Sequence, residues 1–175
     1  MMRQHIAARL RYLRNWEGAN IVLLPICLVV VLISLQPPTW LLSAYSMALI
    51  SLILAQGTYY WHLKLTCLLT RERQLPATFA PRFSQFRRLN LVLLAIYPAL
   101  LAAQLVAGVA RSFEPLLATI MWGIALLEHI NYFHYQLMHD TRADIAYLLR
   151  TRRLRRSPLT SDLRAAARSS AGTHT

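Results

Sequence analysis

The polar residues near the end of the fourth apolar stretch are the ones in this chain best suited to chemistry. Glu128 is the only acid that we expect inside an apolar span, and an ionisable group in lipid is a functional candidate because its burial is costly. On a helix, Asn131, Tyr135 and His139 would share its face, because they follow at three, seven and eleven positions. We therefore expect a polar site around Glu128.

Further polar residues are expected at a similar depth in the other spans. Gln56 and His62 end the second apolar stretch, and Asn20 and Asn90 open the first and third. The candidate intramembrane polar site consists of Glu128, Asn131, Tyr135, His129, Gln56, His62, Asn20 and Asn90.

Three interpretations of this polar layer compete. It is a hydrogen-bond network that fixes helix packing, with some side chains reaching to the headgroups. Alternatively, it is a proton, ion or solute site of a small transporter or oligomeric pore that uses Glu128. In the third interpretation, histidines bind haem or a metal, for example His62 together with His129 or His134.

The histidine spacing does not favour the third interpretation. His129, His134 and His139 are five residues apart, which turns successive rings about 140° around a helix instead of onto one face. We find no nucleophile elbow, P-loop or paired carboxylates. We therefore predict no catalytic residue, no metal site and no cofactor, and an enzyme is the less favoured class.

The elements that must position these residues are membrane helices. The chain has 175 residues, of which 56% are apolar and only 15% charged. The apolar residues form four blocks of a length suited to ~30 Å of hydrocarbon. We expect an all-α integral membrane four-helix bundle within residues 1–138, with spans at about 16–35, 40–60, 91–110 and 115–135 and a loop at 62–89. Residues 139–168 should form a basic helical tail, and 169–175 should be disordered.

The distribution of charge predicts the orientation. Cationic residues exceed acidic ones in the N-terminal segment, in the 62–89 loop and in the tail, whereas the two short connections are neutral. Short loops rich in Lys and Arg stay in the cytoplasm. Both termini are therefore expected to be cytoplasmic.

Two helical hairpins resemble each other, and one helix carries a ladder of small residues. Asn20-Ile-Val-Leu-Leu recurs as Asn90-Leu-Val-Leu-Leu, which is compatible with two tandem parallel repeats or with a chance likeness of apolar helices. The ladder is a candidate packing seam, within the bundle or between subunits of a homo-oligomer. It consists of Ala95, Ala99, Ala103 and Ala107.

The basic segments point to the anionic inner leaflet. Residues 140–155 combine an apolar stripe with arginines, as interfacial helices do. Alternatively, such segments only set the topology. The candidate lipid-binding residues are Arg150, Arg152, Arg153, Arg155 and Arg156. We expect no nucleic acid partner, because the arginines follow the membrane ends without a reading motif.

The stretch Glu128-His-Ile-Asn-Tyr-Phe-His-Tyr-Gln-Leu-Met-His-Asp, with the Arg-rich run after Tyr147, resembles the C-terminal signature of a family of small uncharacterised bacterial four-helix inner-membrane proteins. The resemblance covers about thirty residues and implies a bacterial inner membrane, without implying an activity. We expect a non-enzymatic multi-pass membrane protein that acts through lipid or protein partners at the cytoplasmic leaflet.

Overall fold

The computed structural model of the chain describes residues 2–72, 74–108, 113–137, 150–151 and 154–171. Its elements are the helices α1 (Met2–Leu35), α2 (Leu41–Thr70), α3 (Phe79–Val106), α4 (Glu114–Phe133) and α6 (Pro158–Ala171). Helices α1 to α4 are long and apolar enough to cross a membrane. The prediction of an all-α bundle with four membrane helices is therefore confirmed.

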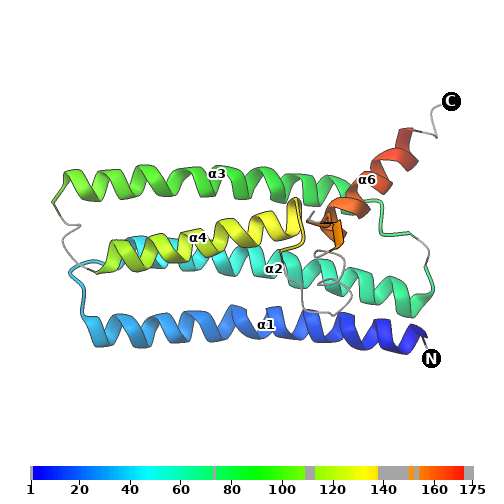
Figure 1. Cartoon of the computed structure of the whole chain (residues 1–175), viewed down its shortest axis with the longest axis horizontal. Helices are drawn as coiled ribbons and strands as arrows, with labels where there is room; N and C mark the ends of the chain where they lie inside the picture. The colour runs from blue at the N-terminus through cyan, green and yellow to red at the C-terminus, as the bar shows by residue number, and fades with distance from the viewer. Residues whose placement is uncertain (1, 73, 109–112, 138–149, 152–153, 172–175) are drawn as a thin grey trace.

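The four long helices lie side by side along one axis (Figure 1). Helix α2 is the centre of the bundle, since α1, α3 and α4 all pack against it. Both termini lie at the same end, which we call the terminal end; here α1 and α3 begin and α2 and α4 end. The other end, where α1–α2 and α3–α4 are connected, is the hairpin end.

Three helices extend past their expected spans at the terminal end. Helix α1 starts at Met2, α2 continues to Thr70, and α3 begins at Phe79. The expected 62–89 loop therefore shortens to residues 71–78. Arg71 ends α2 in the left-handed conformation, at φ 63°. Pro81 lies in the first turn of α3, where a missing N–H is tolerated.

Aromatic residues form the core of the bundle at the terminal end. The rings of Phe79 and Phe83 lie 4.9 Å apart, and Phe83 also contacts the rings of Tyr60 and Tyr59. Phe83 is fully buried, and Phe86 packs against it. These aromatic contacts pack the start of α3 against the end of α2.

The outer surface of the bundle is apolar. Among the side chains of α1, Val22, Leu23, Ile26, Val30 and Ile33 are each more than half exposed. Such a surface is stable only when hydrocarbon or another apolar surface covers it. This agrees with four helices embedded in lipid.

The small-residue ladder also faces outward. Ala95, Ala99 and Ala103 on α3 and Ala107 at its C-cap are all exposed. The ladder is therefore not a packing seam within the bundle, because its face is turned away from α2 and α4. A seam between subunits remains a prediction.

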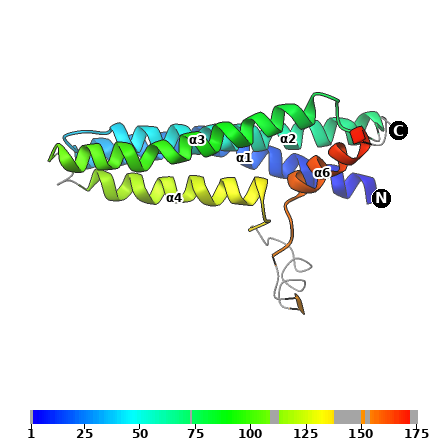
Figure 2. The ribbon, with the colours of Figure 1, turned by 90° about the horizontal axis from the view of Figure 1, so that it is seen from above.

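Helix α4 is shorter than its neighbours, and the tail occupies the space beyond it. α4 ends at Phe133, while α2 continues to Thr70 past that level. Helix α6 lies beyond the end of α4, over the terminal end of the bundle (Figure 2). The tail helix reaches Ala171, so the first three residues of the segment that we expected to be disordered are helical. Most of the expected helix at 140–155 lies outside the described residues.

Candidate functional site

Two amides of the expected polar layer pair with each other. Gln56 Nε2 donates to Asn90 Oδ1 at 2.9 Å, and Asn90 Nδ2 donates to Gln56 Oε1 at 2.7 Å. Both side chains are buried, at 5% and 0% exposure. The pair joins α2 to α3, and it satisfies polar groups that would otherwise be desolvated without a partner.

Glu128 and Asn131 lie together at the end of α4. Asn131 Nδ2 lies 3.5 Å from Glu128 Oε2, at the limit of a hydrogen bond. The other amide atom, Asn131 Oδ1, accepts the N–H of Leu137 at 2.8 Å. Asn131 therefore closes the turn after α4 as well as contacting Glu128.

Three other candidates make no side-chain hydrogen bond to Glu128 in the described structure. Tyr135 was expected on its face, but α4 ends at Phe133, so the helical spacing stops before Tyr135, which is 48% exposed. His62 is exposed on α2, and Asn20 is partly buried on α1. Among the described residues, neither makes a side-chain hydrogen bond to Glu128.

Glu17 is the acid that sequence reasoning missed. In the sequence it follows the arginines of the N-terminal segment, but it lies on the inner face of α1. Its Oε1 accepts the indole N–H of Trp61 at 2.7 Å, and the Tyr132 hydroxyl is also within its reach. The polar layer therefore holds two carboxylates, on α1 and α4.

Gly57 makes this arrangement possible. A Cβ atom at this position would overlap the hydroxyl and the ring of Tyr132, and it would also overlap Glu17 Oε2. Helices α1, α2 and α4 can therefore approach each other here only because residue 57 has no side chain. The best signal in the sequence was a single glycine in an apolar helix, directly before Thr-Tyr-Tyr-Trp.

Two histidines lie together at the end of α4, His129 within the helix and His134 directly after it. His129 is 1% exposed and stacks on Phe133, with ring centroids 5.0 Å apart. Its two ring nitrogens have no hydrogen-bond partner among the described residues. His134 contacts the His129 ring edge-on at 5.8 Å, and partial burial and the positive charge of Arg87 lower the pKa of His134. The described residues contain no group of three or more His, Cys, Asp or Glu side chains that could hold a metal ion.

A second polar cluster lies at the hairpin end, where we expected only an external loop. Glu114 is the first residue of α4 and is 2% exposed. Its Oε1 accepts the backbone N–H of Ser43 at 2.8 Å, in the first turn of α2. Ser46 Oγ donates to the carbonyl of Ala118 at 3.0 Å. A carboxylate at a helix N-terminus satisfies a free N–H and complements the dipole, so this cluster links α2 to α4.

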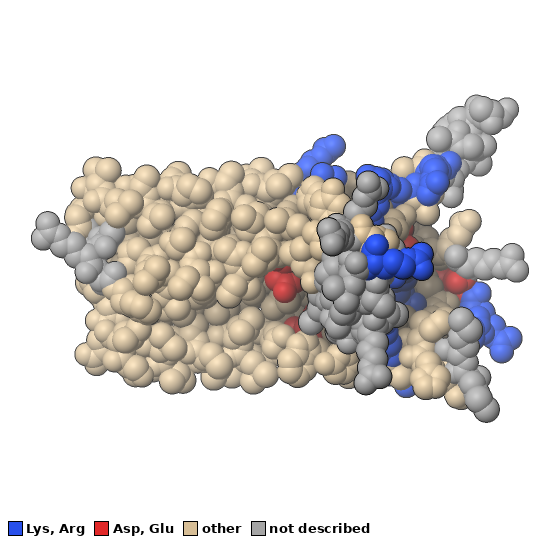
Figure 3. Space-filling model, viewed as in Figure 1, with Lys and Arg blue, Asp and Glu red and all other residues tan. Residues whose placement is uncertain are grey.

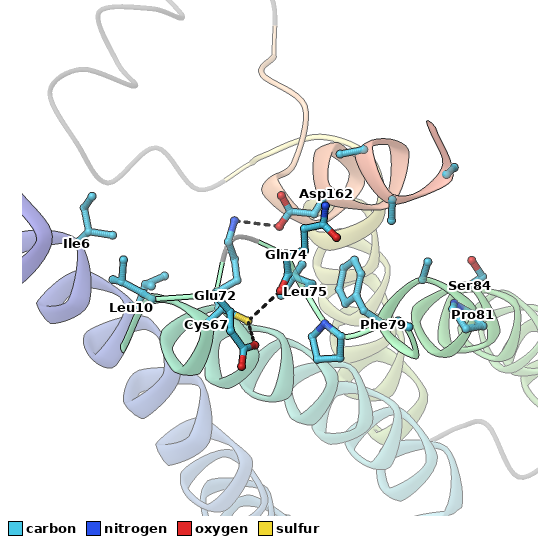
Figure 4. Close-up of a pocket in the computed structure, with 18 residues that line it drawn as sticks. Ile6, Leu10, Cys67, Glu72, Gln74, Leu75, Phe79, Pro81, Ser84 and Asp162 are labelled. Carbon is cyan, nitrogen blue, oxygen red and sulfur yellow. Dashed lines mark hydrogen bonds and ion pairs between the residues drawn. The ribbon is translucent and has the colours of Figure 1, made fainter. Parts of the chain in front are cut away.

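The tail is attached to the bundle through Ser157 and Asp162. Ser157 Oγ caps α6 by accepting the N–H of Thr160 at 3.1 Å, and it also contacts the carbonyl oxygen of Tyr132. Tyr60 Oη donates to Asp162 Oδ2 at 2.7 Å, and Lys64 Nζ lies 2.9 Å from the same oxygen. Asp162 therefore joins α6 to the terminal end of α2 (Figure 4).

Two cavities border this attachment. The loop cavity, of about 840 Å³, lies between the ends of α2 and α3, the loop that joins them and α6 (Figure 4). The tail chamber, of about 610 Å³, lies between α1, α2, the end of α4 and the segment that leads into α6. Its charged lining residues are Arg9, Glu17, Lys64, Arg155, Arg156 and Asp162.

Of the five candidate lipid-binding arginines, three are described. Arg155 and Arg156 line the tail chamber, where Tyr135 and Arg156 pair as an antiparallel bridge. Arg150 is exposed. Arg152 and Arg153 lie outside the described residues.

Comparisons with protein families, with curated proteins and with solved structures found no match to this chain. The structure by itself indicates a multi-pass membrane protein, because it is an all-helical bundle with four candidate membrane-spanning helices.

Proposed function

We propose that this chain is a non-enzymatic protein of a bacterial inner membrane, which acts at the cytoplasmic leaflet through anionic lipid or a protein partner. The supporting observation is the one-sided distribution of charge. Among the described residues, the Lys and Arg side chains seen in this view gather at the terminal end (Figure 3). Membrane proteins keep such residues on the cytoplasmic side.

Anionic lipid is the partner that this arrangement favours. On the face seen in Figure 3, the cations lie at the level where the apolar surface of the bundle stops, which is where lipid phosphates would lie. Each nearby basic residue contributes ~1 kcal/mol of attraction to an anionic leaflet at moderate salt. The contribution falls as salt screens the charge.

The proposal is tested by the thermal stability of the full chain in detergent. Adding phosphatidylglycerol should raise the melting temperature more than adding phosphatidylcholine, because a ligand that binds only the folded state stabilises it. The difference should shrink at high salt. An equal effect of the two lipids at low salt would contradict the proposal.

A small proton or ion transporter is the second candidate, and the position of Glu17 supports it. Glu17 on α1, which accepts from Trp61, adds a second carboxylate to the polar layer that holds Glu128, and two acids in one layer suit a proton or cation better than Glu128 alone. In liposomes, uptake of a cation or proton that Glu17→Gln and Glu128→Gln both abolish would favour this function. Absence of flux would favour the lipid-binding role.

A further inference from the structure

We propose that the tail chamber is a binding site for a single phosphate ester, with a phospholipid headgroup as the favoured source. The inference deepens the proposed function and rests on it: the lipid contact becomes a defined pocket instead of a diffuse charged face.

The first support is the charge of the chamber. Arg9, Lys64, Arg155 and Arg156 line it from three separate segments, against the acids Glu17 and Asp162. Asp162 is already paired with Lys64 at 2.9 Å, and Glu17 accepts the indole N–H of Trp61, so the three arginines exceed the acids that remain. The excess of cations therefore favours an anionic ligand, and the planar guanidinium groups suit two oxygens of one phosphate.

The second support is the helix end that opens into the chamber. Ser157, Pro158 and Leu159, at the N-terminus of the fourteen-residue helix α6, belong to its lining. The positive end of the helix dipole therefore faces the same space as the arginines, which favours an anion there.

The third support is that the chamber is amphipathic. Leu10 and Leu13 of α1 form an apolar wall, and Trp61 and Tyr132 line it near the level where we expect the membrane to end. A volume of about 610 Å³ is of the size that holds a small ligand. A phosphate that carries an apolar group fits this lining better than a bare ion.

The neighbouring loop cavity shows that these features are specific. It is larger, at about 840 Å³, but its only cation is Lys64, against the acids Glu72 and Asp162. Most of its remaining lining is apolar. An anion is therefore favoured in the tail chamber and disfavoured in the loop cavity.

The test counts lipids bound to the intact protein by native mass spectrometry, titrated with phosphatidylglycerol or phosphatidylcholine. Wild type should bind one phosphatidylglycerol with clear preference over further copies. Arg156→Gln should weaken this first binding about tenfold, the size expected for one lost charge-assisted hydrogen bond. Arg156→Lys keeps the charge but loses the planar guanidinium group, so its affinity for the first phosphatidylglycerol should lie between those of wild type and Arg156→Gln. Arg88→Gln is the matched control, because Arg88 is exposed on α3 outside the chamber.

The outcomes separate the site from the general proposal. Equal weakening by Arg88→Gln and Arg156→Gln would overturn the chamber site and leave diffuse binding of anionic lipid. No preference for phosphatidylglycerol over phosphatidylcholine would overturn both. Displacement of the first lipid by glycerol 1-phosphate would support the same site with a soluble phosphate ester as its ligand, and its absence would support the lipid. Unchanged melting temperatures of the variants without lipid would show that folding is intact.

Discussion

At the scale of single residues, the bundle is held by a few polar contacts whose partners come from different helices. Gln56 and Asn90 satisfy each other across α2 and α3, and Glu114 satisfies the start of α2 from α4. In lipid, no water is present to hydrogen-bond an unsatisfied polar group. Removing one partner therefore leaves the other buried without a hydrogen bond.

The amide pair should show this dependence as non-additivity. Gln56→Leu leaves the Asn90 amide buried without a partner and should lower the free energy of unfolding in detergent by ~1–3 kcal/mol. The double variant with Asn90→Leu should lose less than the sum of the single variants. Gln85→Leu, at an exposed position of α3, is the control and should have little effect. Strict additivity would show that the two amides do not interact.

Gly57 should be intolerant of even one methyl group. Gly57→Ala should destabilise the fold by ~1–3 kcal/mol, because overpacking forces α1, α2 and α4 apart. Gly123→Ala is the matched control, since a Cβ there meets nothing within 4 Å. The control should be neutral or slightly stabilising. Tyr132→Phe should partly rescue Gly57→Ala, and a failure to do so would contradict the assigned collision.

The two carboxylates should differ in their importance for stability. Glu17→Leu removes the acceptor of the 2.7 Å bond from Trp61 and should destabilise by ~1–3 kcal/mol. Glu128→Leu loses only the 3.5 Å contact with Asn131 and should cost less. Gln at either position should preserve the fold. Melting temperatures in detergent test the order, and a larger loss for Glu128→Leu would reverse the assignment.

At the scale of elements, α6 is a separate helix that becomes part of the bundle through Leu159 and Asp162. Leu159 is 2% exposed, and Tyr60, the partner of Asp162, is fully buried. The attachment therefore combines apolar burial with a hydrogen bond. Water cannot replace Asp162 as the acceptor of this bond, because Tyr60 is buried.

Weakening this attachment should release the tail helix. Asp162→Ala should increase trypsin cleavage after Arg164 and Arg168 several-fold, because protection depends on how often α6 undocks. Asp162→Asn, which can still accept from Tyr60, should have a smaller effect. Arg164→Lys keeps the cleavage site at an exposed position and serves as the control. Equal cleavage rates in all variants would contradict docking through Asp162.

The helices were largely predictable from the sequence, whereas the site was predictable only in part. Hydropathy predicted the four spans because the requirement for about twenty apolar residues is strong and local. It also placed Gln56 near Asn90 by depth, but it did not predict that they pair. The position of Glu17 could not be predicted, because it follows the arginine-rich segment that ends at Arg14 and only packing turns it inward. Ser157-Pro158 is a helix start signal, with a cap followed by Pro at the first position, and it could have predicted α6.

At the scale of the whole molecule, the bundle has two unlike ends. The terminal end holds both termini, the tail helix and the gathered cations, while the hairpin end turns its one acid of α4, Glu114, inward. Between them lies an apolar surface that needs hydrocarbon. This asymmetry predicts a fixed orientation, with the terminal end in the cytoplasm.

The most direct test of the account is the topology of reporter fusions in the intact membrane. Reporters at Arg3, Pro76 and Ser170 should all behave as cytoplasmic, and a reporter at Pro38 should behave as external. Pro76 is the decisive position, because it lies in the loop between α2 and α3, next to the tail helix. An external signal from the Pro76 fusion would contradict four spans with a cytoplasmic terminal end.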